Sequence, residues 1–157
     1  MIYSHIVVLL DGSELAECVL PHLETFLNSP LTKVDLVRAV PPLEMHYKAA
    51  LPLDKREEQE INEFALKEAR DYLEKVKSRL PARGAEIKLQ VLPGSPADVI
   101  TDYLKTSGAD LLLMATHGRS GVSRWIWGST ADRLLRSTTV PIFLIRPAGC
   151  GMTEEGH

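Results

Sequence analysis

Hydrophobic residues along this chain fall into short runs that alternate with longer amphipathic stretches. Ile6–Leu10 and Leu111–Ala115 contain only apolar residues, which is typical of strands buried on both faces of a parallel sheet. Val34–Val40 and Pro141–Ile145 also favour strands, whereas Ile87–Val91 alternates apolar and polar residues as a half-exposed strand does. The pattern therefore predicts five strands.

Four amphipathic segments between these strands predict helices. Apolar residues recur at helical spacing over Leu15–Leu27 and again over Asp54–Leu80. Asp54 and Glu57 are spaced as a helix N-cap and the acid that caps it in return. The third helix is predicted to begin after its cap, Ser95, and to end at Gly108. The fourth is predicted over Ser129–Ser137.

The regular alternation of strands and helices predicts one α/β domain over residues 1–147, followed by a disordered tail over 148–157. Right-handed crossovers arrange such a chain as a doubly wound, five-stranded parallel sheet with flavodoxin-like layering. Ligands bind such folds beyond the carboxyl ends of the strands, where the strand order reverses. Two loops that follow predicted strands therefore become the candidate site.

Composition narrows the class of protein. The chain has 157 residues, of which 45% are hydrophobic and 25% are charged. It therefore has enough hydrophobic residues to form a core, and its composition is not that of a disordered protein. A formal net charge of -3, without a basic face, argues against nucleic-acid binding. We expect neither export nor membrane insertion, and two widely separated cysteines suit a reducing compartment, so the cytoplasm is the predicted location.

The first candidate loop is the turn that begins at Asp11, and the second follows Ala115 and continues through Gly118 to Gly128. A glycine lets backbone approach a ligand, and the start of the fourth helix offers free N–H groups and a partial positive charge, which suit phosphates. Neither loop has the glycine and lysine spacing of a P-loop or of a dinucleotide-binding fold. Taken singly, these glycines could merely allow turns, and Ser129 could merely cap its helix.

The combination of motifs resembles the universal stress protein family over nearly the whole chain. The family pattern G-x2-G-x9-G-[ST] corresponds to Ala115-x2-Gly118-x9-Gly128-Ser129, and the strand ending at Asp11 also looks like the family. The resemblance implies an adenine nucleotide alpha hydrolase-like fold that often dimerises and that holds ATP in its nucleotide-binding members. Ala115 departs from the first glycine of the pattern by one methyl group, which weakens the ATP assignment without removing it.

By this resemblance, Asp11 would hold the adenosine end of ATP, Val40 would pack on adenine, and Gly118 would approach the phosphates. Mg²⁺ would accompany ATP through those phosphates, and no protein ligand for it can be named. The complete set of residues predicted for the nucleotide site is Leu9, Leu10, Asp11, Val40, Met114, Ala115, His117, Gly118, Arg119, Gly128, Ser129 and Thr130. For His117 and Arg119, ordinary solvated positions in a loop are the competing interpretation.

These residues lead to the hypothesis of a regulatory protein of the stress response that binds ATP and acts as a dimer. Its regulatory partner cannot be identified from the sequence. Two alternatives stay open: a slow ATP hydrolase and a nucleotide-free dimeric interaction module. The last strand is expected at a sheet edge, where a second copy could pair with it. The residues predicted at this dimer interface are Val140, Ile142, Phe143, Leu144 and Ile145.

Overall fold

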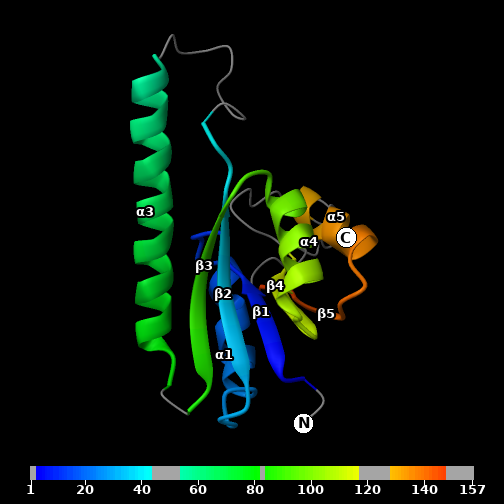
Figure 1. Cartoon of the computed structure of the whole chain (residues 1–157). Coiled ribbons are helices and arrows are strands. Elements are labelled where there is room, and N and C mark those ends of the chain that lie inside the picture. The colour runs from blue at the N-terminus through cyan, green and yellow to red at the C-terminus, as the bar shows by residue number, and fades with distance from the viewer. Residues whose placement is uncertain (1–2, 44–53, 82–83, 117–127, 148–157) are drawn as a thin grey trace, which may run out of the picture.

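A computed structural model describes residues 3–43, 54–81, 84–116 and 128–147 of the chain. Within these residues, five strands form one sheet in the order β3-β2-β1-β4-β5, and every neighbouring pair is parallel (Figure 1). The predicted five-stranded parallel sheet is therefore confirmed. The strands are β1 (His5–Leu9), β2 (Lys33–Val40), β3 (Glu86–Pro93), β4 (Leu111–Ala115) and β5 (Ile142–Ile145).

Helical segments connect the strands on both faces of the sheet. They are the 3₁₀ turn η1 (Ala16–Val19) and the helices α1 (Leu20–Glu24), α3 (Lys55–Arg79), α4 (Pro96–Ser107) and α5 (Ser129–Ser137). The capping box predicted for the long helix is confirmed, because Asp54 accepts from the amide of Glu57 while Glu57 accepts from the amide of Asp54. Gly108 ends α4 with φ of 73°, as a left-handed cap requires.

The first predicted helix is wrong in its extent. Instead of one helix over Leu15–Leu27, the structure has η1 followed by the five-residue α1. Pro21 stands within the first turn of α1, where its missing N–H removes a donor that a longer α-helix would need. A tighter 3₁₀ turn therefore leads into a short helix.

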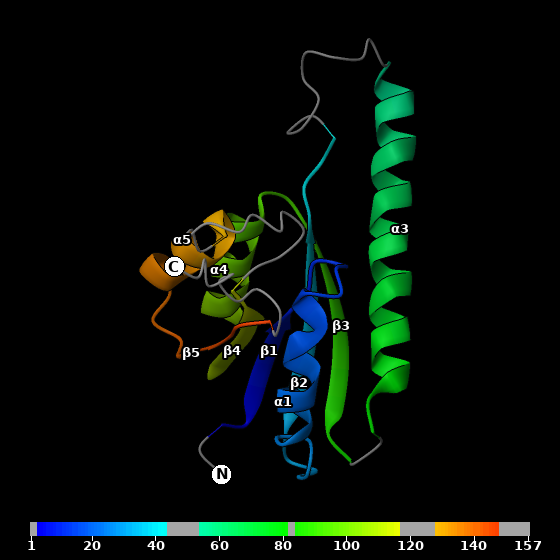
Figure 2. The same cartoon turned by 180° about the vertical axis from the view of Figure 1, so that it is seen from behind.

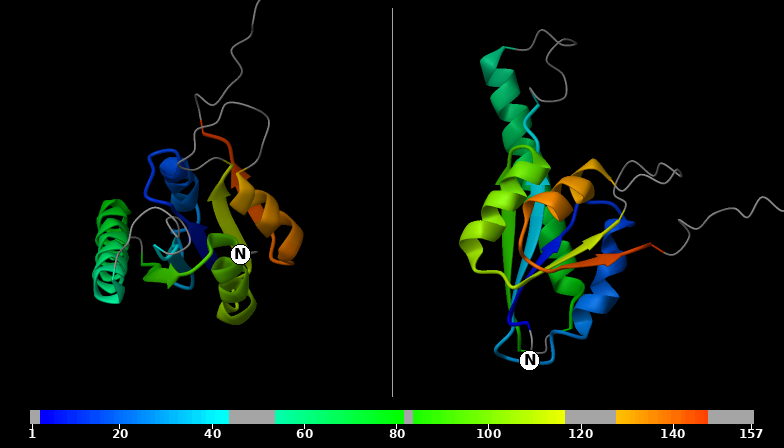
Figure 3. Two further views of the ribbon diagram at one scale, coloured as in Figure 1. Left: turned by 90° about the horizontal axis from the view of Figure 1, so that it is seen from above. Right: turned by 90° about the vertical axis from the view of Figure 1, so that its right-hand side faces the viewer.

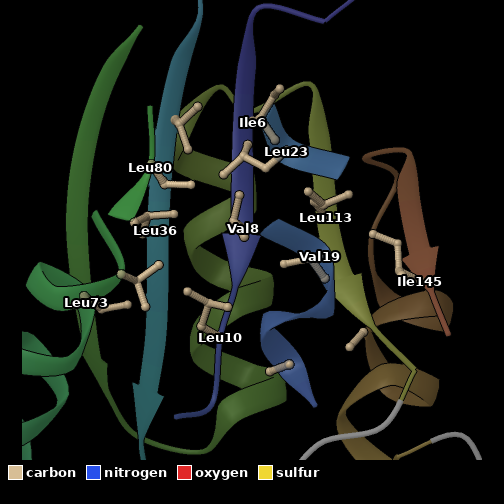
Figure 4. Close-up of a cluster of buried hydrophobic side chains, with 14 of the residues drawn as sticks. Ile6, Val8, Leu10, Val19, Leu23, Leu36, Leu73, Leu80, Leu113 and Ile145 are labelled. Atoms are coloured by element: carbon tan, nitrogen blue, oxygen red, sulfur yellow. The ribbon is translucent and has the colours of Figure 1, made fainter. Parts of the chain in front are cut away.

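Two hydrophobic clusters fill the spaces between the sheet and its helices. One lies between the sheet and η1, α1 and α3, and it includes Ile6, Val8 and Leu36 (Figure 4). The other lies between the sheet and helices α4 and α5, and it includes Val7 and Leu112. Figure 3 shows the sheet running between these two helical layers, and Figure 2 shows α1 on the face away from α4. Among the described residues, no helix is long and apolar enough to cross a membrane.

The order of the strands reverses between β1 and β4. From β1 the chain proceeds outward to β2 and β3, then returns to place β4 on the other side of β1 and β5 beyond it. This is the position at which a doubly wound sheet opens a crevice at the carboxyl ends of its strands. The two candidate loops predicted from sequence leave the sheet at this point, after β1 and after β4.

Candidate functional site at the carboxyl ends of the strands

The turn after β1 is organised by Asp11. Its Oδ1 accepts hydrogen bonds from the amide of Ser13 at 2.9 Å and from the Ser13 hydroxyl at 2.6 Å. The same hydroxyl oxygen accepts from the amide of Ala16 at 3.2 Å. Asp11 therefore folds the turn locally and ties it to η1, in the manner of an Asx turn. Its carboxylate is held at the end of β1 rather than free to rotate.

Gly12 brings this turn against an arginine from the neighbouring strand. Its φ is 86°, in the left-handed region that glycine adopts without strain. A Cβ at this position would lie 2.9 Å from Cζ of Arg38, so the guanidinium occupies the space that another residue's side chain would need. The same guanidinium lies over the ring of Tyr72 on α3, with Cζ 5.1 Å from the ring centroid. Arg38 thus joins the turn to both β2 and α3.

Charged groups surround this contact on the α3 side. Arg79 donates to Oε2 of Glu17 at 2.7 Å, linking α3 to η1. Burial raises the pKa of Tyr72, and the nearby carboxylates of Glu17 and Asp11 raise it further against the opposing effect of Arg38. Tyr72 therefore keeps its proton across the physiological pH range. Within the described residues, its buried hydroxyl has no hydrogen-bond partner of acceptable geometry.

The second part of the site is formed where β4 ends and α5 begins. The Thr116 amide donates to the carbonyl of Ile145 at 2.8 Å, and the Gly128 amide donates to the carbonyl of Thr116 at 3.3 Å. These bonds bring the start of α5 to the carboxyl end of β4. Gly128 is the N-cap and Ser129 the first helical residue, so the interpretation of Ser129 as the cap is wrong.

The first turn of α5 has backbone donors that no side chain satisfies. The structure shows no side-chain hydrogen bond capping this helix within the described residues. The first N–H groups of a helix have no partner inside it, so those of Ser129 and Thr130 are available to an anion. Of the residues that the structure describes, a Cβ at Gly128 would meet only the Thr116 carbonyl oxygen, at 3.7 Å.

The remaining predicted site residues fall into three groups. Leu9 and Val40 lie half-buried at the ends of β1 and β2. Leu10, Met114 and Ala115 have their side chains in the hydrophobic clusters, so only their backbone could contact a ligand. His117, Gly118 and Arg119 lie outside the described residues, and their predicted contacts with phosphate remain predictions.

Continuing the register of β1 and β4 places the last residues before the two candidate loops side by side. Val8 is the partner of Leu113, so two residues further along each strand Leu10 lies beside Ala115. The strands that precede the two candidate loops are therefore neighbours, at the point where the strand order reverses. The arrangement offers a carboxylate on one side and backbone donors on the other. Among the described residues, no group of three histidine, cysteine, aspartate or glutamate side chains could hold a metal ion.

Sequence reasoning missed Arg38 and its contact with Gly12. The signal was available, because Arg38 and Asp35 are the only charged residues inside the second strand's otherwise apolar run, Val34–Val40. A charged residue in a strand that should be buried on both faces requires a partner or a function. The tertiary structure provides a partner for both Asp35 and Arg38.

Comparisons with known proteins identify relatives along nearly the full chain. The model of the universal stress protein family matches residues 2–146. Universal stress protein MJ0577 of Methanocaldococcus jannaschii is 24% identical over 156 residues, which cover 93% of this chain and 96% of that protein. Universal stress protein MJ0531 of the same organism is 31% identical over 86 residues, which cover 55% of this chain and only 51% of that protein.

Solved structures share the fold. That of MJ0577 matches with a TM-score of 0.80 at 24% identity, covering 93% of this chain and 97% of its own. A universal stress protein in complex with cAMP matches with a TM-score of 0.59 at 18% identity, covering 94% and 100%. An Arabidopsis thaliana family protein with AMP bound matches with a TM-score of 0.60 at 12% identity, covering 93% of each chain. At these identities the likeness establishes the fold.

Proposed function

The chain belongs to the universal stress protein family, and on that premise we propose that it binds an adenine nucleotide, ATP, at the carboxyl ends of β1, β2 and β4. The observation that carries the proposal is that the Asp11 turn and the start of α5, which no described side chain caps, both lie at the carboxyl ends of the neighbouring strands β1 and β4, where the strand order reverses. A nucleotide needs a group for its sugar or base and donors for its phosphates, and these two features offer both.

The start of α5 is the proposed phosphate site. Backbone N–H groups and the positive end of the helix dipole favour an anion there, and the hydroxyls of Ser129 and Thr130 add donors. Mg²⁺ would be carried by the phosphates themselves, since the described residues offer no cluster of ligands for it. The metal would supply charge neutralisation of the phosphates, while the chain's own groups bind and orient them.

The end of β1 is the proposed adenosine site. The Asp11 carboxylate has a fixed position because Oδ1 is engaged by Ser13, and it would accept hydrogen bonds from the ribose hydroxyls. Val40, half-buried at the end of β2, would pack on adenine. Two related structures with cAMP and AMP bound support an adenine nucleotide as the ligand class.

Calorimetric titration with ATP and GTP tests this assignment. We expect tighter binding of ATP, because a base-recognition site beside the phosphates discriminates between purines. Equal affinity for the two would contradict it. Mass analysis of nucleotide extracted from the purified protein identifies the ligand carried from the cell, and a steady-state turnover assay separates a binder from the slow hydrolase.

Gly128→Val tests the phosphate site. The substitution is compatible with the fold, because φ at this N-cap is -48° and a Cβ meets only an ordinary contact. It places a branched side chain where phosphate must approach the backbone, so we expect ATP binding to be lost while thermal stability is kept. The matched control is Ser137→Val, an exposed residue at the opposite end of the same helix, which should bind as the parent protein does. Retained binding in Gly128→Val would show that the phosphates lie elsewhere.

We also propose that two copies of the chain form a dimer through β5. In the cytoplasm, the binding of nucleotide would change how this dimer binds its regulatory partner. The strand lies at an edge of the sheet, and Phe143 remains 44% exposed beside the ring of His22. The carbonyls of Pro141 and Ile145 bond to β4, so the alternation of a strand directs the Leu144 N–H to the free edge.

Leu144→Pro is therefore a selective test of pairing through β5. It removes a donor from the free edge without removing a hydrogen bond to β4. Sedimentation at micromolar concentration should give a dimer for the parent protein and a monomer for Leu144→Pro. Phe143→Asp, which places a charge on the exposed surface of the same strand, should also give a monomer. A monomeric parent protein would refute the dimer.

A further inference from the structure

A polar cavity lies at the end of the sheet opposite to the proposed nucleotide site, at the amino ends of β1, β2 and β3. Its volume is about 240 Å³, and it is bordered by the sheet and by α4. In Figure 1 this end of the sheet is at the bottom of the view, away from the carboxyl ends where the nucleotide site is proposed. The residues on which the inference depends are His5, Lys33, Asp35, Glu86, Lys88 and Tyr103.

Asp35 lies against this cavity with a side chain that is only 5% exposed. Its Oδ2 accepts two hydrogen bonds, from His5 Nε2 at 2.6 Å and from the Tyr103 hydroxyl at 2.8 Å. Burial raises the pKa of Tyr103, and its hydrogen bond to Asp35 raises it further, so Tyr103 remains a proton donor. Three elements, β1, β2 and α4, therefore converge on one carboxylate oxygen.

The other oxygen of this carboxylate is unused. Within the described residues, Oδ1 of Asp35 accepts no hydrogen bond, and no lysine or arginine forms an ion pair with this side chain. Among all the described residues, the Tyr72 hydroxyl is the only fully buried side-chain polar atom without a partner, so Oδ1 of Asp35 is not fully buried and retains access to the cavity that Asp35 lines. His5, whose Nε2 lies 2.6 Å from Oδ2, is the one ion-pair partner of Asp35 within the described residues, so a cation on Oδ1 would add a second partner to a deeply buried carboxylate.

Lysines stand at the rim of the same cavity. Lys88 is the register partner of Asp35 on β3 and pairs with Glu86 at 3.2 Å. Lys33 precedes Asp35 by two residues on β2, so it lies on the same face about 7 Å away. Lys33 forms no ion pair with any residue that the structure describes. Asp35 and Lys33 thus present opposite charges on one face of β2, with their Cα atoms about 7 Å apart.

The geometry points to a second ligand site that takes a small zwitterion, with an ammonium group on Oδ1 of Asp35 and an acidic group on Lys33. The spacing suits a molecule whose opposite charges are separated by a short carbon chain, as in an ω-amino acid. Each charge of such a ligand meets its complement, whereas a ligand with one charge leaves the other half of the site unpaired. The site is independent of the proposed nucleotide site.

A set of three matched probes tests this site in the full chain. γ-Aminobutyrate has both charges, butyrate has only the carboxylate, and butylamine has only the ammonium. Titrations followed by amide NMR should show γ-aminobutyrate binding about tenfold more tightly than either of the others. The shifted signals should come from the amino ends of β1, β2 and β3. Equal affinities, no binding, or shifts confined to other regions would overturn the proposal.

Two substitutions separate a ligand role of Asp35 from a structural one. Asp35→Asn and Tyr103→Phe both disturb the hydrogen bond between these residues, but only Asp35→Asn removes the negative charge. We expect Asp35→Asn to lose the preference for γ-aminobutyrate and Tyr103→Phe to keep it. If both variants, still folded by circular dichroism, keep it or both lose it, Asp35 does not act through its charge on the ligand and the proposal fails.

Lys33→Met tests the acidic half of the ligand. This variant should bind γ-aminobutyrate only as tightly as butylamine, about a tenfold loss. Lys105→Met is the matched control, because Lys105 lies on the surface of α4, pairs with Asp102 and does not border this cavity. Its affinity should equal that of the parent protein. Unchanged affinity in Lys33→Met would refute the placement of the acidic group.

Discussion

Substituting Gly12 by alanine tests the contact between the Asp11 turn and Arg38. A residue with a Cβ loses about 1–2 kcal/mol in the left-handed region that Gly12 occupies at φ of 86°. The added Cβ would also lie 2.9 Å from Cζ of Arg38, so the guanidinium at the end of this flexible side chain must shift, which weakens or breaks its contact with the Tyr72 ring. Loss of that cation–π contact costs about 0.5–1 kcal/mol more. We therefore expect Gly12→Ala to reduce the free energy of unfolding by about 2 kcal/mol.

Gly108→Ala is the matched control for this prediction. Gly108 also has positive φ, 73°, but a Cβ there meets no atom within 4 Å, so only backbone strain remains. Urea unfolding of both variants, alone and in an Arg38→Met background, isolates the contribution of the guanidinium. In that background the two glycine substitutions should cost the same. An equal cost in the parent background as well would refute the contact between Arg38 and Gly12.

Three further predictions concern other residues. Asp54→Ala removes the capping box of α3 and should lower the free energy of unfolding by about 1 kcal/mol in urea titrations. Tyr72→Phe should leave that quantity unchanged or slightly higher, because the buried hydroxyl has no hydrogen-bond partner among the residues that the structure describes. Burial acts to raise the pKa of Asp110, but hydrogen bonds donated by Ser4 and His5 outweigh it and lower that pKa. Since a lowered pKa stabilises the fold above the unfolded value of about 4, Asp110→Asn should cost stability at pH 7 and progressively less in acid.

The sheet could be predicted from sequence because each strand has a local pattern of apolar residues that is typical of a strand. Apolar runs such as Ile6–Leu10 exclude an exposed face, and the alternation of strands with helices leaves few arrangements besides a doubly wound sheet. Caps are equally local, since Asp54 and Glu57 make their bonds within one turn. The doubly wound arrangement also puts β4 beside β1, because the strand order reverses there, so the two candidate loops leave the sheet from neighbouring strands.

Other features depend on which strands become neighbours and how closely they pack. The first helix is divided because Pro21 removes a backbone donor, a small effect that apolar spacing does not reveal. Gly128 rather than Ser129 caps α5 because its amide bonds to Thr116 across the site, a contact between distant parts of the chain. Such contacts have no local signature in sequence.

The charged residues of β2 show this division most clearly. In the sequence, Asp35 and Arg38 are the two charged residues of an otherwise apolar strand. Because burying a charge is costly, each side chain is expected to have a polar or charged partner, but the sequence does not identify it. The tertiary structure decides which partner. Alternation along β2 sends Arg38 to the α3 face, against Tyr72 and Gly12, and Asp35 to the α4 face, against His5 and Tyr103. These partners come from separate elements, so only the assembled sheet and its two helical layers bring them together.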